Sequence, residues 1–138
     1  MDRRQFIQAG SAASVLGLSA CASTGGGAGG HVVVVGGGYG GATAAKYLRM
    51  WSDGRVNVTL VEPNDAFVSC PISNLVLGGH KQMADITRGY DGLKALGVKV
   101  VQGEVTVVDA AAKKVRLAGG GELPYDRLIV SPGIDFMT

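Results

Sequence analysis

The sequence predicts an α/β fold in which a parallel sheet is followed by a small β-meander. Residues 32–35 are four consecutive valines, a run typical of a strand that is buried on both faces of a parallel sheet. A glycine-rich turn and a helical segment over Ala42–Met50 follow this strand directly. A second strand is expected over Val56–Val61, so the order strand, helix, strand indicates a βαβ unit.

The composition limits the classes of protein to which the chain can belong. Its 138 residues suit at most one domain, and its net charge of +2 excludes a strongly basic nucleic-acid binder. Apolar residues make up 46% of the chain and charged residues 17%, so disorder is excluded by composition. Two cysteines, Cys21 and Cys70, are too few for a disulfide scaffold or a zinc site. No apolar run reaches the roughly 18 residues of a membrane-spanning helix.

The glycine-rich turn contains the pattern G-x-G-x-x-G at Gly36, Gly38 and Gly41. In this pattern the first glycine permits a tight turn from strand to helix, and the second lets the backbone approach a pyrophosphate. The third glycine lets the helix pack closely on the strand, and the helix N-terminus then offers free N–H groups to the phosphates. The spacing therefore predicts that these three glycines bind a cofactor; the alternative for the glycines alone is a flexible loop.

An acidic residue ends the second predicted strand. Glu62 follows Gly41 by about 20 residues, the spacing expected for a carboxylate that accepts hydrogen bonds from a ribose diol. The alternative is a solvated strand end. Strand, glycines, helix, strand and acid together predict a Rossmann-like dinucleotide-binding unit. Both NAD and FAD remain open as its ligand, because the same unit binds either.

The N-terminal segment is predicted to be a signal for export. Residues 1–21 carry Arg3 and Arg4 near their start and continue into a mildly apolar stretch, which resembles a twin-arginine signal peptide. A short amphipathic helix is the alternative. Cys21 fits both a lipid-modified cysteine and an ordinary cleavage site, so a membrane-anchored lipoprotein and a free periplasmic protein both remain open. The glycine-rich residues 22–30 are expected to form a flexible linker.

Further along the chain, the sequence predicts a helix over Gln82–Leu96 and a third parallel strand over Val98–Gln102. An alternating segment, a short strand and a closing strand with its turn follow: Gly103–Asp109, Lys114–Leu117 and Leu123–Gly133. This arrangement resembles the FAD domain of the two-dinucleotide-domain flavoprotein disulfide reductases. The resemblance implies that backbone groups near Val105 meet the adenine and that the turn at Gly133 lies against the flavin nucleotide. It also implies that residues 31–138 are the N-terminal part of an FAD-binding domain.

The segment around Cys70 points to one family among these flavoproteins. The segments Phe67–Gly79 and Ile86–Leu93, together with Val32–Ala45, closely resemble the flavoprotein subunit of flavocytochrome c sulfide dehydrogenase, within the pyridine nucleotide-disulfide oxidoreductase superfamily. That resemblance implies that the cysteine is joined to the 8α-methyl of FAD by a thioether. A small buried cysteine that only packs and a disulfide with Cys21 are the alternatives.

The same resemblance implies an exported FAD-dependent oxidoreductase that oxidises sulfide and passes electrons to a c-type cytochrome subunit. The alternatives are a sulfide:quinone oxidoreductase-like protein, another NAD(P)- or FAD-dependent oxidoreductase, and a non-catalytic nucleotide-binding module. In the resembled family, the redox-active cysteine pair lies in a later region that this sequence lacks. The sequence is therefore expected to be an N-terminal fragment that is inactive alone, with no catalytic residue and no metal ligand of its own.

Overall fold

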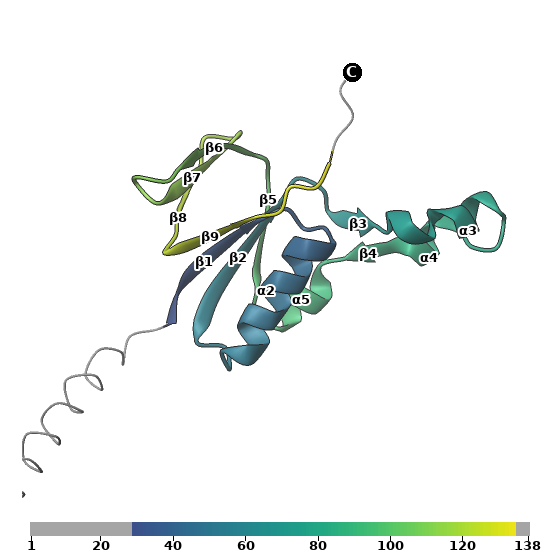
Figure 1. Cartoon of the computed structure of the whole chain (residues 1–138), viewed down its shortest axis with the longest axis horizontal. Coiled ribbons are helices and arrows are strands. Elements are labelled where there is room, and N and C mark those ends of the chain that lie inside the picture. The colour runs from purple at the N-terminus through teal and green to yellow at the C-terminus, as the bar shows by residue number, and fades with distance from the viewer. Residues whose placement is uncertain (1–28, 135–138) are drawn as a thin grey trace, which may run out of the picture.

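Four parallel strands form the central sheet of the computed structural model, which describes residues 29–134. In spatial order they are β5 (Lys99–Gln102), β2 (Val56–Glu62), β1 (Gly29–Val35) and β9 (Arg127–Val130). All three pairings in this sheet are parallel, and β1 lies between β2 and β9 (Figure 1). The predicted α/β fold class is confirmed.

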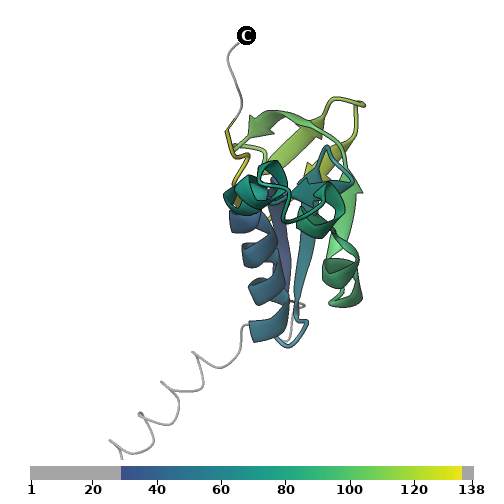
Figure 2. The same cartoon turned by 90° about the vertical axis from the view of Figure 1, so that its right-hand side faces the viewer.

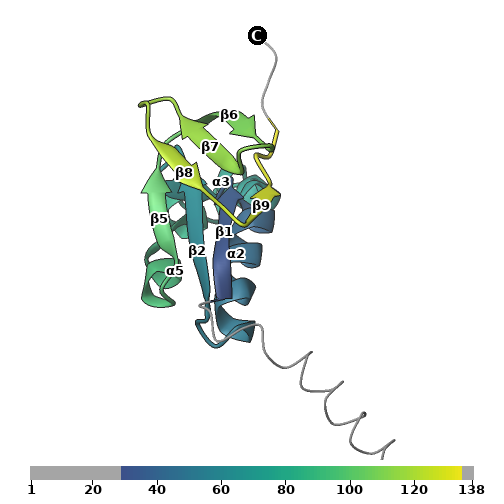
Figure 3. The same ribbon diagram turned by 90° about the vertical axis from the view of Figure 1, so that its left-hand side faces the viewer.

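The two faces of the sheet are covered by different kinds of structure. Helices α2 (Tyr39–Trp51) and α5 (Asp91–Ala95) cover one face. The other face is covered by an antiparallel meander, as Figure 3 shows. The meander consists of β6 (Val105–Asp109), β7 (Lys114–Leu117) and β8 (Glu122–Pro124).

This two-sided cover explains the run of valines in β1. Val32 and Val34 belong to the core cluster that contains Ala45 of α2, whereas Val33 belongs to the cluster that contains Val115 of β7. Successive side chains of a strand point to opposite faces, so a strand buried on both faces needs an apolar residue at every position.

An arm extends from the sheet beyond the carboxyl end of β2, and we call residues 66–89 the cysteine arm (Figure 1). In Figure 2 the arm points toward the viewer. It begins and ends with two antiparallel strands, β3 (Ala66–Val68) and β4 (Thr87–Gly89). Between them lie η1 (Cys70–Ile72), α3 (Ser73–Leu77) and α4 (Met83–Ile86). Within residues 29–134, no helix is both long and apolar enough to cross a membrane.

The prediction of one continuous helix over Gln82–Leu96 is wrong, because strand β4 separates the short helices α4 and α5. Ile86 and Tyr90 are 1% and 6% exposed, so the interruption buries an apolar side chain at each end of β4. Pairing of β4 with β3 supplies hydrogen-bond partners for backbone groups of this segment. The free energy gained by burying Ile86 and Tyr90 then outweighs the helical propensity of the segment.

Two predicted boundaries also shift at the start of the domain. Strand β1 begins at Gly29, so the last two residues of the predicted linker lie in the sheet, where Gly29 pairs with Val56. The His31 N–H donates to Asp126 at 2.6 Å, which ties the start of this strand to the segment before β9. Helix α2 begins at Tyr39 rather than at Ala42. The predicted signal peptide over residues 1–21 lies outside the described residues.

Arg49, in the last turn of α2, connects two loops at the end of the sheet opposite the arm. These are the loop that leads into β2 and the loop that follows α5. The Arg49 Nη1 donates to the carbonyls of Gly54 at 2.6 Å and Val56 at 2.7 Å, and its Nε donates to the carbonyl of Leu96 at 3.2 Å. Arg49→Ala is expected to lower the free energy of unfolding by about 2 kcal/mol, because these carbonyls lose a charged donor. Thermal unfolding measures this change.

Arg55→Ala is the matched control for Arg49→Ala. The Arg55 side chain is exposed and donates to the carbonyl of Ser52 within its own loop. This control is expected to change the free energy of unfolding by less than about 0.5 kcal/mol. Equal losses in the two variants would show that Arg49 does not join the two loops.

Candidate cofactor-binding site

Two of the predicted glycines lie where another segment of the backbone comes too close to leave room for a side chain. Gly36 has a φ of +95°, and a Cβ there would lie 2.0 Å from the carbonyl oxygen of Ser131. A Cβ at Gly41 would lie 1.8 Å from the carbonyl oxygen of Gly36. These glycines therefore allow the turn after β1 to press against α2 on one side and against the end of β9 on the other.

Gly38 differs from its two neighbours in the pattern. A Cβ at this position would meet only the ring of Phe67, at 3.8 Å, so no atom of the described chain demands a glycine here. Gly38 is the N-cap of α2, whose first turn carries no acidic side chain. A side chain at Gly38 would project beside the N-terminus of the helix, where an anionic ligand would bind. The lack of a side chain at Gly38 therefore leaves the N-terminus of α2 accessible to an anionic ligand such as a phosphate group.

The Glu62 carboxylate is held beside the glycine turn. Its Oε2 accepts the Gly37 N–H at 2.6 Å, and its Oε1 accepts the Asn64 N–H at 3.1 Å and Nδ2 at 2.8 Å. A carboxylate offers about four lone-pair sites, so about one remains for an incoming hydroxyl donor. The carboxylate is half-buried and its orientation is set before any ligand arrives.

A cavity of about 550 Å³ lies at the carboxyl ends of β1, β2 and β9, and we call it the larger cavity. Ligands of open parallel sheets bind at this edge, beside the point at which the strand order reverses, and here that point lies between β1 and β9. Four of the predicted cofactor-binding residues line the larger cavity: Gly36, Glu62, Val105 and Gly133. A Cβ at Gly133 would meet no atom of residues 29–134 within 4 Å, so this glycine borders space that the described part of the chain leaves free.

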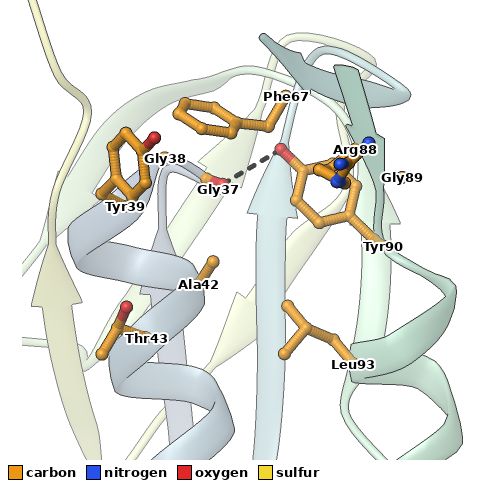
Figure 4. Close-up of a pocket in the computed structure, with 10 residues that line it drawn as sticks. All are labelled: Gly37, Gly38, Tyr39, Ala42, Thr43, Phe67, Arg88, Gly89, Tyr90 and Leu93. Atoms are coloured by element: carbon orange, nitrogen blue, oxygen red, sulfur yellow. Dashed lines mark hydrogen bonds between the residues drawn. The ribbon is translucent and has the colours of Figure 1, made fainter. Parts of the chain in front are cut away.

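A second cavity of about 150 Å³, the smaller cavity, lies between the first turn of α2, the cysteine arm and α5. Figure 4 shows Gly37, Gly38, Tyr39, Phe67 and Tyr90 around it. The glycine turn therefore lies between the two cavities, with Gly36 bordering the larger one and Gly38 the smaller one.

Cys70 lies apart from both cavities, as the first residue of η1 in the cysteine arm. Its side chain is exposed and is a free thiol. The preceding Ser69 is buried and its hydroxyl is hydrogen-bonded to the hydroxyl of Tyr39. The Ser73 hydroxyl donates to the Cys70 carbonyl at 2.7 Å. The backbone around the thiol is therefore held on both sides, while the sulfur remains accessible.

Sequence reasoning missed three residues that shape this site. Asn64 holds Glu62, and its position two residues after the acid could have suggested this role. Tyr39 stacks edge-on against Phe67 with ring centroids 4.8 Å apart, and it anchors Ser69 beside Cys70. Neither the contact of Tyr39 with Ser69 nor the position of Tyr90 leaves a signal in the sequence, because both depend on how the arm folds back toward α2.

Comparison with known proteins identifies the family. The sequence model of the family described as pyridine nucleotide-disulphide oxidoreductase matches residues 30–136. The chain belongs to this family. Membership confirms the predicted oxidoreductase class and implies a flavin cofactor.

Individual relatives agree with the family assignment. The chain is 67% identical over 38 residues to the flavoprotein chain of sulfide dehydrogenase [flavocytochrome c] from Chlorobaculum thiosulfatiphilum, a match that covers 28% of this chain and 77% of that one. This match confirms the resemblance drawn from the sequence.

Solved structures of other oxidoreductases share the fold. The sulfide:quinone oxidoreductase of Aquifex aeolicus superposes with a TM-score of 0.69 at 27% identity, over 78% of this chain and 25% of that one. The covalent putidaredoxin reductase–putidaredoxin complex gives a TM-score of 0.66 at 29% identity, over 77% and 26%. The chain thus spans about a quarter of the length of these solved proteins.

Proposed function

We propose that the chain forms the nucleotide-binding part of an exported FAD-dependent oxidoreductase that oxidises sulfide. When bound, the flavin would supply the capacity to take electrons from sulfide and release them to a c-type cytochrome subunit. The observation that carries the proposal is the larger cavity, which gathers Gly36, Glu62, Val105 and Gly133 at the carboxyl edge of the sheet. The similarity to a sulfide dehydrogenase flavoprotein chain supports the choice of substrate and electron acceptor.

The residues present fit the adenosine diphosphate half of FAD. Free N–H groups at the start of α2, beside the open space at Gly38, would bind the phosphates. Glu62 would accept a ribose hydroxyl on the oxygen site that its protein partners leave available. Backbone groups near Val105 would meet the adenine, and Gly133 would leave room for the nucleotide. A cavity of about 550 Å³ is within the usual size range of cofactor sites.

Cys70 would anchor the ring of the flavin through a thioether to the 8α-methyl carbon. The accessible thiol and the backbone hydrogen bonds around it support this role, because a reacting sulfur must be exposed and held in place. A covalent bond would also prevent loss of the cofactor in a compartment where FAD is not replenished.

Cys70→Ala tests the anchor. After denaturation in acid, the flavin absorbance of the native full-length protein is expected to precipitate with the polypeptide. The flavin of the variant is expected to stay in the supernatant, because the variant has no sulfur to hold it. Lys81→Ala, which removes an exposed side chain elsewhere in the cysteine arm and keeps the thiol and its hydrogen bonds, is expected to retain the flavin on the polypeptide. A yellow supernatant from the native protein would reject the role of Cys70.

Export by the twin-arginine route is also part of the proposal. Arg3 and Arg4 and the apolar stretch that completes residues 1–21 support it. Cys21 would either carry a lipid anchor or lie at the cleavage site, and the two outcomes would give a membrane-attached and a free periplasmic protein respectively.

A second candidate function is oxidation of sulfide with a quinone as the acceptor. The TM-score of 0.69 and the 27% identity to a sulfide:quinone oxidoreductase favour this alternative. The two functions differ in the acceptor, so reduction of a c-type cytochrome and reduction of a quinone by the full-length protein, each measured with sulfide, distinguish them.

A further inference from the structure

Tyr90 lies beneath the glycine turn, at the junction of β4 and α5. Its side chain is 6% exposed and belongs to the core cluster between α2 and the sheet. Its hydroxyl donates to the carbonyl oxygen of Gly37 at 3.1 Å, as Figure 4 shows. A Cβ at Gly37 would lie 2.4 Å from this hydroxyl oxygen. Tyr90 therefore explains a glycine that the G-x-G-x-x-G pattern itself does not require.

Gly37 is held from both sides. Its carbonyl accepts the Tyr90 hydroxyl, and its N–H donates to Glu62 at 2.6 Å. The two peptide planes that flank the Gly37 Cα are thus each fixed by one side chain. A hydrogen-bonded chain runs from Tyr90 through Gly37 to the carboxylate proposed to bind the ribose.

The fixed carbonyl also orients the next donor in the turn. The described peptide bonds are all trans, and a trans peptide points its C=O and N–H in opposite directions. Because the Gly37 carbonyl points to Tyr90, the Gly38 N–H points away from Tyr90. Burial, and after it the charge of Glu62, raises the pKa of Tyr90 to about 12, so the hydroxyl keeps its proton and remains a donor at neutral pH.

We propose that Tyr90 is a positioning residue for the nucleotide site, which sets the Gly37 carbonyl and thereby the Gly38 N–H and the Glu62 carboxylate. This inference rests on the proposed function, since it assigns Tyr90 to the binding of the same nucleotide. Tyr90 does not touch the larger cavity, and it acts through the backbone of the glycine turn.

Tyr90→Phe removes the hydroxyl and keeps the ring in the core. The full-length protein carries Cys70→Ala in every arm, so that FAD exchanges freely and its dissociation constant can be measured by flavin fluorescence. Tyr90→Phe is expected to weaken FAD about 10-fold, and to weaken ADP by a similar factor, because the loss concerns the adenosine half. The matched control is Tyr125→Phe, which removes a hydroxyl that donates to the Asp109 carbonyl within the meander. It is expected to leave both affinities unchanged.

A double-mutant cycle separates positioning from a general loss of stability. If Tyr90 acts through Gly37 on Glu62, Tyr90→Phe and Glu62→Gln together weaken FAD by less than the product of the two single effects. Effects that multiply, or equal FAD affinity of the Cys70→Ala protein with and without Tyr90→Phe, would overturn the inference. Failure of the full-length Cys70→Ala protein with Tyr90 intact to bind FAD or ADP would instead overturn the proposed function.

Discussion

Gly41→Ala is expected to lower the free energy of unfolding by about 3 kcal/mol or more and to abolish flavin binding. The new Cβ would lie 1.8 Å from the carbonyl oxygen of Gly36, a backbone atom that cannot move without displacing the turn. Alanine in a helix is normally favoured over glycine by about 1 kcal/mol, so the expected sign is opposite to the intrinsic propensity. Thermal unfolding and the flavin content of the purified full-length protein measure the two effects.

Gly92→Ala is the matched control, because Gly92 is also a helical glycine, in α5. A Cβ there would meet no atom of the described chain within 4 Å. This variant is expected to be more stable than the native protein by about 0.5–1 kcal/mol and to keep its flavin. If Gly41→Ala were as stable as Gly92→Ala, α2 would not approach the turn as closely as the structure has it.

Glu62→Ala is expected to weaken the binding of FAD about 100-fold. The substitution removes the proposed acceptor for the ribose, and it also leaves the buried Gly37 N–H without its partner. A buried N–H group without an acceptor lowers the free energy of binding further, so the expected loss of affinity exceeds that of one hydrogen bond. Flavin fluorescence titration of the full-length protein with the Cys70→Ala substitution measures the dissociation constant.

Asp65→Ala controls for the loss of negative charge in the same loop. Asp65 is exposed and does not line the larger cavity. Its substitution is expected to change the affinity for FAD by less than about twofold, as for a surface charge in water. Similar losses in Glu62→Ala and Asp65→Ala would indicate that the loop acts through its charge and not through the geometry of Glu62.

The cysteine arm is tied to helix α2 close to the proposed flavin anchor. Similarity at the sequence level led to the proposed role of Cys70 as the flavin anchor. The structure adds that Tyr39 and Ser69 tie the arm to the first turn of α2, next to the glycine turn. The proposed anchor and the proposed phosphate site are therefore linked by a direct contact between side chains 30 residues apart in the sequence.

The sequence by itself determined the βαβ unit, because its signals are local. The valines at 32–35 predicted a strand buried on both faces, and the structure divides them between two core clusters. The spacing of Gly36 and Gly41 likewise predicted a turn that the close backbone contacts require.

Only the tertiary structure decided where distant segments meet. The segment Gln82–Leu96 does not form the predicted continuous helix, because pairing of β4 with β3 and burial of Ile86 and Tyr90 outweigh its local helical propensity. The tertiary structure also brought Val105 and Gly133 to the cavity that Glu62 borders. The physical reason is that propensity and periodicity act between neighbours in the chain, whereas the partner of a buried hydroxyl such as that of Tyr90 is set by packing between residues far apart in sequence.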